Sequence, residues 1–125
     1  MKKLIETQNA PKAIGPYSQG VEANGTVYVS GQLPIDPITM KLCEGNIKTQ
    51  TLCSLRNIQA ILEEAGYRKE DIVKCTVYLK NMDVFSEMNE AYQTFFGSLK
   101  PARVTVEVSR LPKDAPIEID AIAVK

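Results

Sequence analysis

The chain has 125 residues and a mass of 13.8 kDa, which is the usual size of a single globular domain. Hydrophobic residues make up 44% and charged residues 24%, a composition that excludes a disordered segment. Fifteen basic residues balance 15 acidic ones, and a zero net charge argues against a general nucleic-acid partner, because nucleic-acid binders need a basic surplus to neutralise phosphates.

The membrane and the secretory pathway are also disfavoured. No apolar run approaches the ~20 residues that a membrane-spanning helix needs. The first six residues, MKKLIE, turn polar too soon for a signal peptide. We therefore expect an intracellular, cytoplasmic protein without a membrane partner.

Two features of the composition narrow the chemistry. Histidine is absent, which removes the usual general base near neutral pH, the Ser-His and Cys-His pairs, and His-ligated zinc. The three cysteines, Cys43, Cys53 and Cys75, are odd in number and have no C-x-x-C spacing. They are expected to be reduced thiols, with Cys75 buried in a strand and Cys43 in a loop as the most reactive. No metal site is expected.

The first elements predicted along the chain are strands. Residues 26–33, TVYVSGQL, are β-branched and aromatic and predict a strand. An earlier strand is expected over 17–23, joined to it by a turn at Asn24-Gly25, since both residues accept a positive φ. Gly31 inside the second strand indicates a β-bulge or a close backbone approach. A further short strand is expected at the N-terminus.

From Asn46 the apolar residues recur at helical spacing, which predicts a helix over 47–65 with Asn46 as N-cap and Gly66 as its end. Residues 73–80 alternate between apolar and polar and predict a strand with one buried side. A second helix is expected after Asp83. Two more alternating strands are expected at 103–108 and 117–123.

The order ββαβαβ predicts an α+β fold in one domain, residues 1–125, with both helices on one face of the sheet. Two helices cannot cover both faces of five or six strands. A half-apolar, half-charged open face suits water poorly and predicts an oligomer interface that carries a polar site. The side chains expected on this open face are those of Arg103, Thr105, Glu107, Glu118, Asp120, Ile122 and Val124.

Taken singly, the polar candidates have ordinary explanations. Arg103 could be a solvated charge paired with Glu107 or Glu118, which would give Glu118 a purely structural role. Tyr17 could be a packed aromatic residue. Asn89 inside a helix usually faces water.

Taken together, most of the candidate residues fall in three segments whose combined sequence is typical of one protein family. They are APKAIGPYSQ at 10–19, YVSGQLPIDP at 28–37 and PARVTVEVSRLPKDAPIEIDAIA at 101–123. In order and spacing they closely resemble the YjgF/Rid family of reactive-intermediate imine deaminases, and the resemblance covers essentially the whole chain. It includes the Asn89-Glu90-Ala91-Tyr92 segment.

The resemblance implies a chorismate-mutase-like homotrimer with a mixed sheet, two helices on one face and clefts between subunits. It implies cofactor-free hydrolysis of imines and enamines such as 2-aminoacrylate, which yields 2-oxo acids and ammonia. Arg103 matches the arginine that grips the substrate carboxylate, and Glu118 matches the glutamate that holds the attacking water. Positions lining the cleft are matched by Tyr17, Ser30, Gly31 and Asn89.

The chain departs from the family pattern at two places. Thr105 stands where some members have a cysteine, so a mechanism that needs that thiol is excluded, although Thr105 can still donate a hydrogen bond. Met40 stands where many members have glycine after Asp-Pro-x-Thr, a change expected to alter a surface turn rather than the site.

The site is expected to need two subunits. If the strands at 103–108 and 117–123 formed a simple hairpin, Glu118 would lie opposite Val108, about 16 Å from Arg103. One small substrate could not then touch both residues of one chain. Two alternatives remain: an RNA-directed ribonuclease or translation inhibitor, and a non-catalytic trimer that binds small carboxylates or acts as a holdase.

Overall fold

The computed structural model describes all 125 residues and contains six strands and two α-helices. Short 3-10 turns precede β4, α2 and β6. The strands and helices expected along the chain are all present, including the short strand at the N-terminus, and their order is βββαβαββ, which ends in two strands rather than the one of ββαβαβ. In chain order the elements are β1 (Lys3–Ile5), β2 (Gly20–Ala23), β3 (Thr26–Gln32), α1 (Ile47–Glu64), β4 (Ile72–Leu79), α2 (Phe85–Phe96), β5 (Ala102–Glu107) and β6 (Ile117–Val124).

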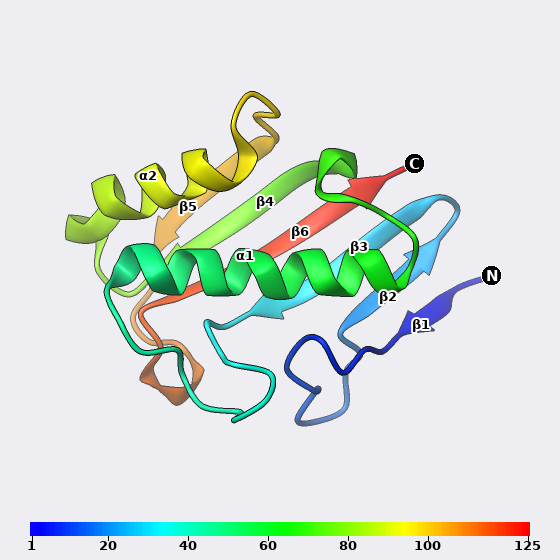
Figure 1. Cartoon of the computed structure of the whole chain (residues 1–125), viewed down its shortest axis with the longest axis horizontal. Coiled ribbons are helices and arrows are strands. Elements are labelled where there is room, and N and C mark those ends of the chain that lie inside the picture. Colours follow the sequence, from blue (N-terminus) through cyan, green and yellow to red (C-terminus); the bar gives the residue numbers. More distant parts are fainter.

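The six strands form one mixed sheet in the order β1-β2-β3-β6-β4-β5. All neighbouring pairs are antiparallel except β4 and β5, which are parallel and are connected through α2. Both helices lie on the same face of the sheet (Figure 1). The α+β class and the one-sided placement of the helices are therefore confirmed. Neither helix is long and apolar enough to cross a membrane.

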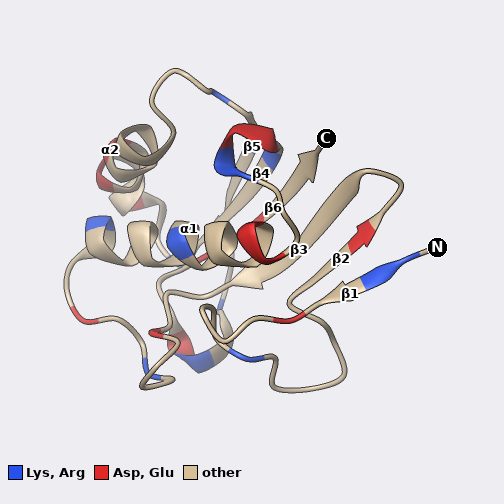
Figure 2. Cartoon of the chain, turned by 45° about the vertical axis from the view of Figure 1, so that its right-hand side comes forward, with Lys and Arg blue, Asp and Glu red and all other residues tan.

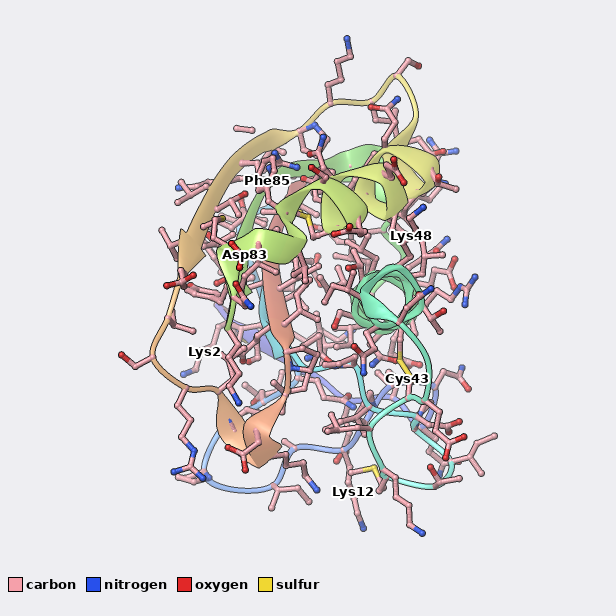
Figure 3. All side chains as sticks on the ribbon, turned by 90° about the vertical axis from the view of Figure 1, so that its left-hand side faces the viewer. Lys2, Lys12, Cys43, Lys48, Asp83 and Phe85 are labelled. Carbon is pink, nitrogen blue, oxygen red and sulfur yellow. A yellow bond between two sulfur atoms is a disulfide. The ribbon has the colours of Figure 1, made fainter.

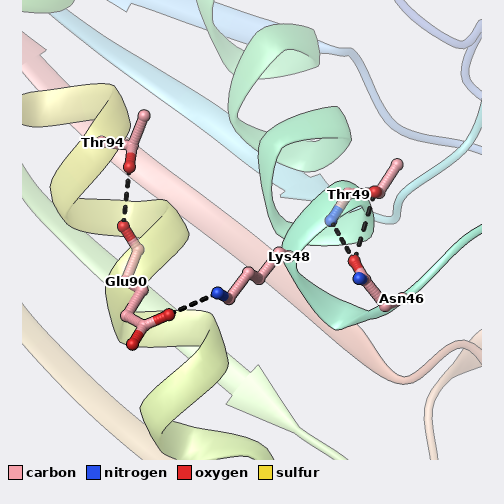
Figure 4. Close-up of polar contacts among 5 residues, drawn as sticks. All are labelled: Asn46, Lys48, Thr49, Glu90 and Thr94. Carbon is pink, nitrogen blue, oxygen red and sulfur yellow. Dashed lines mark hydrogen bonds and ion pairs between the residues drawn. The ribbon is translucent and has the colours of Figure 1, made fainter.

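Helix α1 forms where its sequence predicts it. The Asn46 side chain accepts a hydrogen bond from the Thr49 amide at 3.0 Å, and Gly66, with φ of +81°, follows the last turn. Lys48 forms an ion pair with Glu90 of α2 that links the two helices (Figure 4). The hydrogen bond to Glu90 raises the pKa of Lys48.

The core lies between the sheet and the two helices. Its members are the inward side chains of the central strands and the apolar stripes of the helices, and many of them are fully buried. Burial of this kind is the dominant favourable contribution to folding. Fully buried members include Val27, Leu55, Ile58, Ile61, Leu62, Cys75, Val77, Leu79, Met88, Ile117 and Ile119.

The expected hairpin of the last two strands is wrong. Strand β6 lies between β3 and β4, and β5 is an edge strand on the far side of β4. The crossover through α2 places β5 parallel to β4, and β6 then returns antiparallel into the remaining gap. Alternating patterns identify both strands, but they do not say which neighbour each strand has.

The expected orientation of β5 is also wrong. The register sets Arg103 opposite Cys75 and Thr105 opposite Val77, and both partners on β4 are fully buried under the helices. Paired residues of neighbouring strands point to the same face, so Arg103, Thr105 and Glu107 face the helix side. Val104 and Val106 face the open side, where they are 43% and 38% exposed.

The open face of the sheet is apolar with a polar centre. Tyr28, Val104, Val106 and Val124 are exposed on it. Between them, Asp120 accepts hydrogen bonds from the Tyr78 hydroxyl at 3.0 Å and from the Thr76 amide at 3.2 Å. Exposed apolar side chains grouped on one sheet face around a polar centre are typical of an interaction surface in soluble proteins.

The cysteines also differ from expectation, because Cys43 and Cys53 form a disulfide (Figure 3). The loop after β3 returns to α1, where the Gln50 side-chain amide donates to the Cys43 carbonyl at 3.2 Å, and this return brings the two sulfurs together. Cys75 is free and buried as expected, and burial raises the pKa of its thiol to about 11.

A labelling experiment tests this pairing. Without a reductant, we expect the native protein to take up no thiol-alkylating reagent, since two thiols are bonded and Cys75 is inaccessible. Mild reduction should expose Cys43, and Cys75 should react only on unfolding, as read from peptide masses. Reduction should lower the free energy of unfolding by at most ~3 kcal/mol, because the closed loop is short. Labelling of Cys43 in unreduced native protein would contradict the bond.

Candidate active site

A cavity of about 480 Å³ lies beside β3 and β6 and contains the carboxyl group of Glu118. It collects several of the residues expected in the site: Tyr17, Ser30 and Gly31 line it together with Glu118. Its volume falls in the range of small-molecule sites. The remaining lining residues are Pro11, Lys12, Ile14, Gln19, Gln32, Leu33, Ile35, Met40, Pro112 and Lys113.

Gly31 packs directly against the Glu118 side chain. The register between β3 and β6 shifts between Val29 and Gln32, which confirms the bulge expected at this glycine. A Cβ atom placed on Gly31 would lie 2.8 Å from the Glu118 Cδ atom, closer than such atoms approach in proteins. The bulge and the missing side chain together leave room for the carboxyl group.

The carboxyl group of Glu118 is partly buried. Burial raises its pKa above the ordinary glutamate value, and the nearby Asp120 carboxylate raises it further. A carboxylate of raised pKa is a better proton acceptor than an exposed one, which suits it to general-base chemistry.

The N-terminal segment is held over this cavity by Gln19, a residue that the sequence analysis did not single out. Its side chain accepts from the Thr7 amide at 2.7 Å and donates to the carbonyls of Thr7, Ala10 and Pro11. Gln19 is only 3% exposed. Nothing in the spacing identifies it, because a glutamine at the start of a strand is usually on the surface.

Two residues expected to line the cleft are positioned by this segment. The Ser30 hydroxyl donates to the Ser18 carbonyl at 2.6 Å, and the Ser30 amide donates to the Gln19 carbonyl at 2.9 Å. Tyr17 is 53% exposed, and its hydroxyl oxygen accepts from the Ile14 amide at 3.4 Å. The Tyr17 ring therefore stands at the mouth of the cavity.

Substitution Gly31→Ala tests the packing at the bulge. The added methyl group forces the Glu118 carboxyl group to move, while the core of the sheet is untouched. If the Glu118 carboxylate reacts, we expect turnover to fall by at least about tenfold with little change in the melting temperature. Kinetics and thermal unfolding on one preparation check this, with Gly66→Ala as a control in which the positive φ is strained but the added atom meets nothing. Unchanged turnover in Gly31→Ala would contradict the tight fit.

Arg103 lies outside the Glu118 cavity, in a separate hollow beside α2. One guanidinium nitrogen donates to the Asn89 side-chain oxygen at 2.8 Å, and the guanidinium carbon lies 4.8 Å from the Tyr92 ring centre. The ring of Phe85 is 5.6 Å away on α2. Stacking on aromatic rings fixes the plane of the group and leaves its other donors free. Arg103 and Asn89 share a hollow of about 360 Å³ with Lys100, which precedes β5, and with further residues of α2.

The ordinary explanation of Arg103 as one partner of an ion pair is not observed. Glu107 accepts from the Met82 amide at 2.7 Å, and Glu118 lies on the other face of the sheet. Thr105 follows Arg103 on the helix side and lines neither cavity. Its hydroxyl is buried without a hydrogen-bond partner, as is that of Tyr92.

Within one chain, Arg103 and Glu118 lie too far apart to contact the same small molecule. Arg103 pairs with Cys75 and Glu118 with Tyr78, on opposite sides of β4. Three residues along the strand and two strand spacings across give about 14 Å between their Cα atoms, and the side chains point to opposite faces. The separation expected from the sequence is thus present, although its basis in a hairpin was wrong.

A metal site would require a group of ligating side chains that lie close together. No three His, Cys, Asp or Glu side chains are grouped so that they could hold a metal ion. The charged groups at the Glu118 cavity are this carboxyl group and the ammonium groups of Lys12 and Lys113.

Fold and candidate residues together define a small α+β domain with two polar hollows, one beside Glu118 and one beside Arg103, on opposite faces of one sheet. A family model described as Endoribonuclease L-PSP matches residues 7–125. The chain therefore belongs to this family, which is the YjgF/Rid family recognised from its three segments.

Relatives and a solved structure agree along the full length. The chain is 58% identical over 125 residues to a RutC family protein of Pyrococcus horikoshii, covering 100% of this chain and 99% of the relative. It is 49% identical over 128 residues to the 2-iminobutanoate/2-iminopropanoate deaminase of Salmonella typhimurium, covering 100% and 99%. The crystal structure of Escherichia coli TdcF with bound serine superimposes with a TM-score of 0.94 at 44% identity, covering 98% of each chain.

Proposed function

We propose that the protein hydrolyses reactive enamines and imines such as 2-aminoacrylate to 2-oxo acids and ammonia, without a cofactor, in clefts between the subunits of a homotrimer. The observation that carries the proposal is that one chain presents both a stacked, partly free Arg103 and a partly buried Glu118 of raised pKa. The deaminase name of a relative at 49% identity supports it.

Arg103 is proposed to bind the substrate carboxylate. A planar guanidinium makes two parallel charge-assisted hydrogen bonds to a carboxylate, and the Arg103 group has only one donor engaged, with Asn89. Its stacking on Tyr92 limits rotation, so the bound carboxylate would be held in one orientation. The serine bound to the related TdcF also carries a carboxylate.

Glu118 is proposed to hold and deprotonate the attacking water. 2-Aminoacrylate first tautomerises to 2-iminopropanoate. The water oxygen then bonds to the imine carbon, both water protons pass to the nitrogen through the Glu118 carboxylate, and the carbon–nitrogen bond breaks. One imine and one water become one 2-oxo acid and one ammonia. This chemistry needs orientation and one proton carrier, which a carboxylate supplies.

The assembly follows from the separation of Arg103 and Glu118. A substrate that touches both residues requires Arg103 of one subunit to approach Glu118 of another. The exposed apolar side chains of Tyr28, Val104, Val106 and Val124 provide a surface on which subunits would pack. In such a trimer Tyr17, Ser30 and Gly31 line the cleft from the Glu118 side, and Asn89 supports Arg103 from its own side. A substrate contact of Thr105 stays a prediction from the sequence, because its hydroxyl is buried in the single chain and lines neither cavity.

A coupled assay tests the activity. Threonine dehydratase generates the transient imine, and its disappearance is followed with and without micromolar protein, with ammonia and 2-oxobutanoate quantified at the end point. Acceleration over the spontaneous rate is expected. No acceleration would favour the non-catalytic carboxylate-binding alternative, which calorimetry with 2-oxobutanoate would then examine.

RNA cleavage is the other activity attached to the family by name. The chain has no net charge, and its basic and acidic residues are scattered over helices, strands and loops (Figure 2). An RNA-binding groove needs a concentrated basic surface. Charge distribution therefore favours a small carboxylate over a polynucleotide.

A further inference from the structure

Met40 lies in a strained position at the wall of the Glu118 cavity. Its φ is +60°, a left-handed conformation that glycine adopts freely and methionine adopts only at a cost. The turn is fixed by Asp36, whose side chain accepts from the Ile38 amide at 2.7 Å and whose carbonyl accepts from the Met40 amide at 2.8 Å. The expectation that this position affects only a surface turn is wrong, because Met40 lines the cavity.

The wall around Met40 is apolar. Ile14, Leu33 and Ile35 line the same cavity, which has Glu118 as its only carboxyl group. Met40 also lines a neighbouring cavity of about 610 Å³, so it stands between the two. A thioether side chain in this place offers a flexible, polarisable surface to an apolar ligand group.

The loop that carries Met40 is held firmly. The Asn57 side chain donates to the Leu33 carbonyl at 3.3 Å and to the Ile35 carbonyl at 2.9 Å. The Cys43 amide donates to the Pro34 carbonyl at 2.7 Å, and the disulfide ties Cys43 to α1. Binding to a wall that is already ordered costs little conformational entropy.

We propose that Met40 determines substrate specificity and makes this cavity prefer imino acids with long, unbranched apolar side chains over 2-iminopropanoate. The inference rests on the proposed deamination. In the single chain, with Met40 in place, the cavity measures about 480 Å³, far more than the three-carbon imine fills. A longer side chain gains contact with Met40, Ile14 and Leu33 and loses contact with water.

The test compares two imines in each of several variants. D-Amino-acid oxidase with catalase generates the imines of alanine and norleucine, and kcat/KM is measured for each. In Met40→Gly we expect the ratio of the norleucine imine to the alanine imine to fall about tenfold, since one apolar contact in a pocket is worth at least that much. Met40→Leu should keep the ratio within about threefold, because volume and polarity are preserved.

Two further variants make the comparison decisive. Ile38→Ala is the matched control: it removes an apolar side chain from the same turn, but Ile38 is 91% exposed and does not line the Glu118 cavity, so the ratio should not change. Met40→Asn introduces a residue that tolerates positive φ and replaces the apolar contact with a polar one. It should lose the preference as Met40→Gly does.

Binding separates this inference from the proposed function. Calorimetric dissociation constants for pyruvate and 2-oxohexanoate should show the same loss of preference in Met40→Gly and Met40→Asn. If the unaltered protein accelerates neither imine, the proposed function fails, whereas the binding ratio still measures the role of Met40. An unchanged or increased long-to-short ratio in both variants, with unaltered thermal unfolding, overturns the inference.

Discussion

Replacing Glu118 by glutamine is expected to lower kcat/KM for 2-iminobutanoate by two to four orders of magnitude, the range that general acid–base groups contribute. Glutamine keeps the size of the side chain beside Gly31 but cannot accept the water proton. The measurement is the coupled dehydratase assay, with Glu64→Gln at the exposed end of α1 as a control expected to keep full activity. Activity of Glu118→Gln within a few fold of the unaltered protein would remove Glu118 from the mechanism.

The pH dependence gives this variant a second readout. The pKa of Glu118 is raised. On acidification, activity should therefore begin to fall at a higher pH than it would if Glu118 had the ordinary glutamate pKa. The ionised carboxylate costs stability above its folded-state pKa, and this cost disappears below the unfolded-state pKa. Glu118→Gln should therefore melt at or above the temperature of the unaltered protein at neutral pH. The difference should vanish in acid, as followed by thermal scans across pH.

Arg103→Lys is expected to lower kcat/KM by roughly 30-fold or more, which is about 2 kcal/mol and the lower end of the cost of disrupting a desolvated charge pair. Lysine keeps the charge but loses the two-pronged geometry and the stacking on Tyr92. Arg110→Lys is the matched control, since Arg110 forms an exposed ion pair with Asp114 at 2.7 Å. It should change neither activity nor unfolding, and near-normal turnover of Arg103→Lys would refute the carboxylate clamp.

Mixing variants tests whether the site is shared between subunits. Arg103→Ala and Glu118→Gln should each be nearly inactive alone. After dissociation and reassembly at equal amounts, half of the subunits carry an intact Arg103 and the other half an intact Glu118. If subunits associate at random, about a quarter of the clefts should combine both intact residues. Recovery of about a quarter of the full activity is therefore expected. No recovery despite exchange of subunits, shown by native mass spectrometry, would place both residues outside a shared cleft.

The sequence by itself determined which elements form and, within about three residues, where they lie, since the strand expected at 17–23 begins at Gly20. Asn46 and Gly66 bound α1 because a side-chain cap and a left-handed glycine are local devices, legible without knowledge of the fold. The alternation at 117–123 and the glycine at 31 were equally sufficient for β6 and its facing bulge. The matching segments brought Tyr17, Ser30, Gly31 and Glu118 forward as candidates, and the fold gathers these four around one cavity.

Only the tertiary structure decided how those elements face each other. In an alternating strand, either set of alternate side chains can face the core until the neighbouring strands are known. The sequence therefore predicts Arg103 on the open face, whereas in the structure it stacks on aromatic rings of α2. The partner of Cys43, the clamp made by Gln19 and the place of Met40 all depend on loops that return from distant parts of the chain. Such contacts are set by the packing of the whole domain, which local propensity does not encode.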